Sequence, residues 1–153
     1  MKITIIVLYL IILSIYDIRT QKVPVMWLAA GSVAAFGTIV WEISDVLEIL
    51  GNWQELWPTL WKELGQELLI GWLPGLVLLG ACIVTGRVGS ADGWVLLIVG
   101  SMIGSGQMMA AFGCSMILIA VMAGVLLLLK KAGKNDRLPY LPFLTAAVVL
   151  VRL

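Results

Sequence analysis

The chain has no histidine, two cysteines and few charged residues, and each shortage excludes a class of function. Cys82 and Cys114 lie in separate apolar stretches without the paired spacing of metal ligands. A zinc hydrolase or a Cys–His nucleophile is therefore excluded, and no metal or other cofactor is expected. Ten Lys and Arg against nine Asp and Glu leave a net charge of +1, too small a basic excess for a nucleic-acid partner. Hydrolytic chemistry in this chain would depend on carboxylates.

Apolar residues are abundant: 61% of the 153 residues are hydrophobic and 12% are charged, with a mean hydropathy of +1.07. So little polar surface predicts a protein that lies in a lipid bilayer. A helix crosses the bilayer core with roughly 20 residues, fewer where flanking side chains reach the interface. We predict an all-α, polytopic fold, a single domain over residues 1–153 with about six transmembrane helices. The expected spans are Ile3–Tyr16, Val23–Trp41, Leu68–Thr85, Gly93–Gly106, Met108–Leu129 and Leu138–Leu153.

The distribution of cations predicts the orientation. With six spans, seven of the ten Lys and Arg residues lie in connections on one side and three on the other. Because cytoplasmic connections carry the excess of cations, the side with seven is assigned to the cytoplasm and the amino terminus to the outside of the plasma membrane.

The outer connection, residues 42–67, differs from the rest of the chain. It holds six acidic residues against Lys62 alone, and Trp53, Trp57 and Trp61 recur at a spacing of four. This pattern predicts an amphipathic helix in the outer interface, with its aromatic side toward lipid. We expect it to serve as an anchor or a lid without chemistry of its own.

The stretch Gly100-Ser101-Met102-Ile103-Gly104 has the small-xxx-small form that predicts close helix contact.

Asp17 and Asp92 are the informative carboxylates. The spans Ile3–Tyr16 and Gly93–Gly106 are short, so their helices are expected to extend through both aspartates, placing them at one depth near the cytoplasmic face. Carboxylates at such a depth are costly unless they are paired, solvated or used. Structural roles are the alternatives: a helix cap for Asp92, and an ion pair with Arg19 or Lys22 for Asp17. Taken singly, each structural role is the preferred interpretation.

If the two carboxyls lie close together, they share one proton and titrate as a unit. The ionised member then withdraws a proton from water while the protonated member polarises a carbonyl. Such a pair could hydrolyse a peptide bond.

Three motifs resemble those of the type IV prepilin leader peptidases, in the same order. Asp17-Ile18-Arg19-Thr20-Gln21-Lys22-Val23-Pro24 resembles the first aspartate motif, in which a basic residue and then a proline follow the aspartate. Gly89-Ser90-Ala91-Asp92 is similar to the GxGD signature, with Ala91 in place of the second glycine and Trp94 where the family usually has lysine. The segment 138–144, Leu-Pro-Tyr-Leu-Pro-Phe-Leu, resembles the Pro-x-x-Pro-Phe-Leu entry of the last helix.

The resemblance covers essentially the whole chain and implies an intramembrane aspartic endopeptidase with Asp17 and Asp92 as catalytic residues. The implied partners are prepilins or pseudopilins, which lose a short basic leader at the cytoplasmic face. The implied substrate-binding residues are Gly89, Gly93, Pro139 and Pro142. Gly86, Gly89 and Gly93 would permit an unwound segment beside Asp92, although an ordinary glycine-rich loop explains them equally well. The chain has no paired CxxC motifs, so a compact peptidase without the zinc-bearing domain of larger members is expected.

A small membrane scaffold or transport subunit with structural aspartates is the alternative. Proton transport needs titratable groups across the membrane thickness. The predicted spans contain no further acids or histidines in their interiors, which argues against a relay but leaves a scaffold open.

Overall fold

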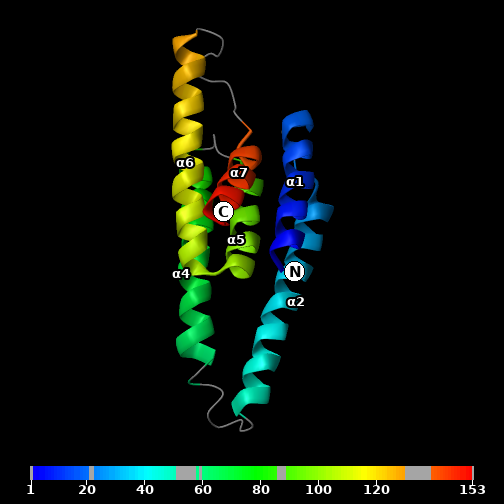
Figure 1. Cartoon of the computed structure of the whole chain (residues 1–153). Coiled ribbons are helices and arrows are strands. Elements are labelled where there is room, and N and C mark those ends of the chain that lie inside the picture. The colour runs from blue at the N-terminus through cyan, green and yellow to red at the C-terminus, as the bar shows by residue number, and fades with distance from the viewer. Residues whose placement is uncertain are drawn as a thin grey trace. The chain divides into compact units, whose positions relative to one another are not determined.

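The structure, a computed structural model, describes residues 2–20, 23–50, 58, 60–85, 89–129 and 139–152. These residues form helices and contain no strand, which confirms the all-α prediction for this part of the chain (Figure 1). The elements are α1 (Lys2–Thr20), α2 (Val25–Leu50), the π-helix η1 (Leu60–Gly65), α4 (Gln66–Thr85), α5 (Ser90–Ile103), α6 (Ser105–Leu128) and α7 (Leu141–Arg152).

Each of the six apolar runs corresponds to a helix. The expected extension of the two short runs is confirmed, since α1 continues through Asp17 to Thr20 and α5 begins at Ser90. Pro24 precedes α2, and its carbonyl accepts a hydrogen bond from the Trp27 amide at 3.0 Å. Gly104 separates α5 from α6 with a φ of 91°, a conformation that glycine adopts without steric cost.

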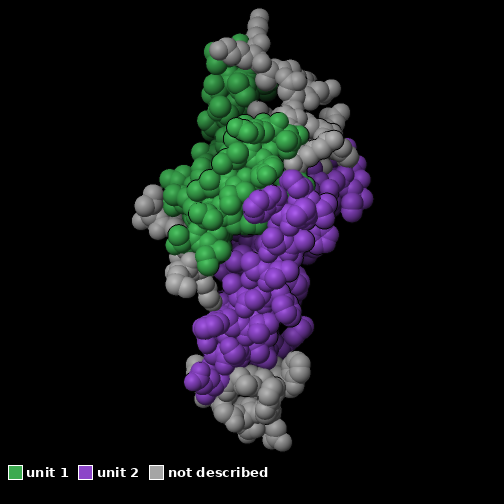
Figure 2. All heavy atoms as spheres, turned by 90° about the vertical axis from the view of Figure 1, so that its right-hand side faces the viewer, with its two compact units in different colours: residues 1–23, 109–153 green, residues 24–108 purple. Residues whose placement is uncertain are grey.

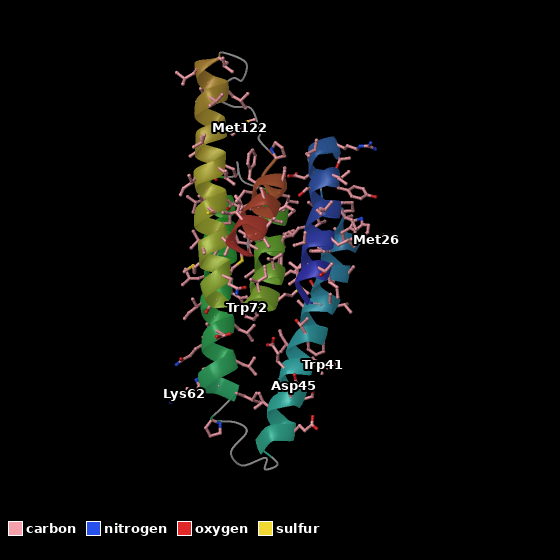
Figure 3. All side chains as sticks on the ribbon, viewed as in Figure 1. Met26, Trp41, Asp45, Lys62, Trp72 and Met122 are labelled. Carbon is pink, nitrogen blue, oxygen red and sulfur yellow. The ribbon has the colours of Figure 1, made fainter. Side chains whose placement is uncertain are left out.

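Three stretches of the described helices are long and apolar enough to cross a bilayer: Val25–Val46 in α2, Leu60–Thr85 through η1 and α4, and Ser105–Leu128 in α6. Their surfaces suit lipid, because large apolar side chains are exposed on them (Figure 3), including Met26, Trp41 and Met122. The helices α5 and α7 are apolar but shorter. The fold is therefore compatible with a membrane protein, and the count of six spans stays a prediction.

The outer segment of residues 42–67 is described only in part. Its first residues continue α2 as far as Leu50, so Glu42 and Asp45 belong to the same helix as the preceding apolar run. Trp61 lies in η1 with its side chain exposed. Trp53 and Trp57 lie outside the described residues. The separate interfacial helix accordingly stays a prediction.

Contacts divide the chain into two compact units, coloured separately in Figure 2. Unit 1 comprises residues 1–23 and 109–153, and unit 2 comprises residues 24–108. The single domain stays a prediction.

In unit 1, α7 packs along α1, and in Figure 1 it lies between α1 and α6. The buried side chains of this contact come from both helices: Ile6, Leu10, Leu13, Leu141, Leu144, Ala147 and Val148.

Unit 2 is organised around the pair α4 and α5, with α2 packed against α5. Glycines allow the close approach of α4 and α5: a Cβ atom on Gly71 would lie 2.8 Å from the carbonyl oxygen of Gly100. One turn along, a Cβ on Gly75 would lie 2.9 Å from the carbonyl oxygen of Gly93. The close helix contact predicted at Gly100 is confirmed, and its partner is the Gly71-x-x-x-Gly75 pattern of α4.

Candidate functional site

Asp17 lies near the end of α1 and is buried, with 7% of its surface exposed. Its Oδ2 atom accepts a hydrogen bond of 3.2 Å from the backbone amide of Leu141, the first residue of α7. The backbone of Tyr140 donates to the same carboxylate. Arg19, one of the cations considered as its partner, has an exposed side chain, and Lys22 lies outside the described residues. The contact observed for Asp17 is thus with the start of α7.

This contact completes the hydrogen bonding at the amino terminus of α7. A helix begins with backbone amides that have no partner inside the helix. Here the amides of Tyr140 and Leu141 donate to Asp17, and Pro142 has no amide hydrogen. The Phe143 and Leu144 amides donate to the Tyr140 carbonyl at 3.1 and 3.2 Å. The carboxylate of Asp17 therefore serves as the amino-terminal cap of another helix.

A second polar contact joins α1 and α7 one helical turn away. The hydroxyl oxygens of Ser14 and Thr145 are 2.7 Å apart. The Thr145 hydroxyl also lies within donating distance of two helix carbonyls, at 2.8 Å from Leu141 and 3.3 Å from Leu10. The hydrogen bonds of Asp17 and Ser14 to α7 together fix the register of α1 against α7.

The segment before α7 is also attached to α6. The Tyr140 hydroxyl lies 3.0 Å from the Ser115 hydroxyl, and both side chains are buried. Unit 1 therefore holds the Pro139–Pro142 turn from two sides, by Asp17 on α1 and by Ser115 on α6.

Asp92 lies in unit 2, in the first turn of α5, and is partly buried. Gly89 is the N-cap residue and adopts an extended conformation, so Asp92 occupies the third helical position and not the cap that the alternative interpretation gave it. A Cβ on Gly89 would lie 3.1 Å from the Asp92 Oδ2 atom, so the carboxylate lies over this glycine.

The structure brings the predicted site residues together in two groups. Asp17, Pro139 and Pro142 are neighbours in unit 1, and Gly89, Asp92 and Gly93 follow one another in unit 2. The pairing of Asp17 with Asp92, which joins residues of different units, stays a prediction.

The unwound segment expected at the glycines is not observed at Gly93. This residue lies inside α5, because its missing side chain admits Leu79 and the backbone of Gly75 from α4. Helix packing accounts for Gly93 as it does for Gly100. Gly86 lies outside the described residues.

Sequence reasoning missed a polar pocket in unit 2. It has a volume of about 120 Å³ and its polar lining includes Glu42, Glu67 and Ser101. Beside it, the indole nitrogen of Trp72 (labelled in Figure 3) donates a 2.7 Å hydrogen bond to Ser101. The sequence pattern predicts an interfacial helix without chemistry for the segment that holds Glu42 and Glu67, and no motif links these residues to Ser101.

No group of three or more His, Cys, Asp or Glu side chains that could hold a metal ion occurs within the described ranges. Comparisons with protein-family models, with curated proteins and with solved structures find no match to this chain.

Proposed function

We propose that the chain is an intramembrane aspartic endopeptidase that cleaves the leader from type IV prepilin-like or pseudopilin substrates, with Asp17 and Asp92 as its catalytic pair. The observation that carries the proposal is the hydrogen bond between the Leu141 amide and Asp17. Two motifs that resemble the peptidase family, 124 positions apart in the sequence, meet at this atom pair.

Burial adds to this support. Asp17 is the one acidic side chain among the buried polar residues of the described part of the chain. Burying a carboxyl group is costly unless its oxygens find donors, and in membrane proteins such groups commonly mark functional sites. Two backbone amides supply the donors here and also fix the orientation of the group.

The proposed chemistry uses one proton shared by the two carboxyl groups. The ionised carboxylate takes a proton from water as the water oxygen adds to the scissile carbonyl carbon, while the protonated carboxyl donates to the carbonyl oxygen. The carbon–nitrogen bond then breaks: the departing amine takes the proton that came from water, and a hydroxyl of the tetrahedral intermediate returns its proton to the other carboxylate as the carbonyl forms again. Both carboxyl groups return to their initial states, so the proposed reaction needs only the two carboxyl groups and water.

The proposed substrate matches the proposed location. A prepilin presents an apolar helix in the bilayer and a cationic leader at the cytoplasmic surface, so the catalytic pair must lie near that surface. We propose that the carboxyl end of α1, with Asp17, and the amino end of α5, with Asp92, both lie on the cytoplasmic side of the plasma membrane. The excess of Lys and Arg in the connections on that side supports this orientation.

One observation favours a second candidate function, a non-enzymatic membrane scaffold. Asp17 caps α7 and joins it to α1, and this role alone explains why a buried carboxylate stabilises the fold. A scaffold would need Asp17 for assembly and would have no use for Asp92 in hydrolysis.

The proposal is tested by co-expressing the chain with prepilins and pseudopilins in cells that lack prepilin peptidase activity. We expect at least one substrate to become shorter by its leader, with the new amino terminus lying just before the apolar helix. Immunoblots would show the shortening, and mass spectrometry would identify the cleaved bond.

The matched control is the Asp17→Asn/Asp92→Asn double variant, produced at the same level in the same membranes. Substrates that remain at full length with both proteins would contradict the peptidase and favour the scaffold.

A further inference from the structure

Tyr140 connects the Pro139–Pro142 turn, which contacts Asp17 on α1, to the helix α6. Its backbone amide belongs to the pair of donors on the Asp17 carboxylate, and its carbonyl accepts the first hydrogen bonds of α7. Its side-chain hydroxyl reaches Ser115 on α6 at 3.0 Å. One residue therefore contacts the candidate catalytic group through its backbone and α6 through its side chain.

The direction of this hydrogen bond follows from the other partner of Ser115. The Ser115 hydroxyl donates its single proton to the Phe112 carbonyl of its own helix at 2.8 Å. Tyr140 is consequently the donor and the Ser115 oxygen the acceptor. Ser115 is fully buried and Tyr140 is 7% exposed, so water cannot replace either partner without entering the unit.

The neighbouring prolines determine what this bond can control. Pro139 and Pro142 fix two φ angles of the short segment that carries the Tyr140 and Leu141 amides. A segment this stiff moves as a unit when one end is released. Because the Tyr140 ring is its attachment to α6, loss of the hydroxyl contact would let both amides move relative to Asp17.

We propose that Tyr140 and Ser115 are positioning residues, which hold the turn so that its amides orient the Asp17 carboxyl group for catalysis. This inference rests on the proposed peptidase function. Neither side chain is assigned a contact with the substrate, so both act through the orientation of Asp17.

Tyr140→Phe and Ser115→Ala test the proposal, because each removes one oxygen and keeps nearly the same volume. In a purified cleavage assay we expect each variant to lower kcat about tenfold, the effect of losing one buried hydrogen bond from the transition state, with KM unchanged. The double variant should be no slower than either single variant, because all three lack the same bond. Ser32→Ala is the control, since Ser32 is exposed on α2 and donates to the Leu28 carbonyl of its own helix; it should keep the original kcat.

Hydrogen–deuterium exchange supplies a second readout. The amides of Tyr140, Leu141, Phe143 and Leu144 should exchange faster in Tyr140→Phe and in Ser115→Ala than in the original chain, while those in the middle of α1 should not change. Unchanged exchange in residues 140–144, or unchanged kcat in both variants, would overturn the inference. The peptidase proposal fails separately, if Asp17→Asn cleaves as fast as the original chain in the same assay.

Discussion

Asp17→Asn is expected to abolish leader cleavage, with a loss of at least about a thousandfold, as is typical when a positioned acid–base group is removed. Asparagine has nearly the shape of aspartate and keeps an oxygen that can accept the Leu141 amide, so the cap of α7 is retained. Its amide group can neither take a proton from water nor hold the shared proton. The fold should therefore survive while the chemistry is lost. Asp92→Asn should have the same effect.

Asp45→Asn is the matched control for these variants, since it makes the same chemical change at an exposed position of α2. It should cleave at the original rate. Rates are compared at equal protein levels in membranes, by following the shortening of a co-expressed prepilin. Cleavage at the original rate by Asp17→Asn or Asp92→Asn would remove that residue from the mechanism.

Gly71→Ala is expected to destabilise the protein by about 3 kcal/mol, the upper end of the usual cost of adding atoms to a packed interior. The new Cβ would lie 2.8 Å from the Gly100 carbonyl oxygen, a backbone atom that cannot rotate away. The helices α4 and α5 must move apart, and the contact between Gly75 and Gly93 would loosen with them. Thermal unfolding of the purified protein in detergent, followed by tryptophan fluorescence, would show a lower Tm.

Gly80→Ala provides the comparison within the same helix. A Cβ at Gly80 meets nothing within 4 Å, so the substitution should leave the Tm unchanged or raise it slightly, because alanine favours helix. Equal Tm values for Gly71→Ala and Gly80→Ala would contradict the account of the α4–α5 contact.

The α-helices were largely predictable from the sequence because each contains most of one of the apolar runs. Their ends were less predictable: α2 continues from Trp41 to Leu50 through Glu42 and Asp45, where composition suggested a separate segment. Hydrogen bonds within a helix are satisfied locally, so a helix can continue through a change from apolar to acidic residues. Hydropathy alone does not mark such an end.

The surroundings of Asp17 could be anticipated only in part. Its motif pointed to Asp17, and the resemblance of residues 138–144 pointed to the start of α7, but neither predicted that the two would share a hydrogen bond. The contact between Ser14 and Thr145 joins residues 131 positions apart, and isolated hydroxyl residues carry no pattern that identifies their partners. Asp92 is a plausible cap from sequence because aspartate favours that position, whereas in the structure Gly89 occupies it.

The close packing of α4 on α5 could have been found from the sequence. Gly71 and Gly75 have the same spacing as Gly100 and Gly104, and this spacing places both members of a pair on one helix face. The prediction uses only the second pair, of which Gly100 makes the contact while Gly104 ends α5.

Cross-linking of positions 17 and 92 tests the central claim most directly. Asp17→Cys and Asp92→Cys are combined in a chain whose free cysteines, Cys82 and Cys114, are replaced by alanine, and membranes are treated with a short bifunctional thiol reagent. Ser14→Cys/Thr145→Cys is the positive control, because those side chains are in contact at 2.7 Å. We predict that mass spectrometry finds a linked peptide pair in both variants. A linked control together with unlinked cysteines at positions 17 and 92 would contradict the catalytic pair.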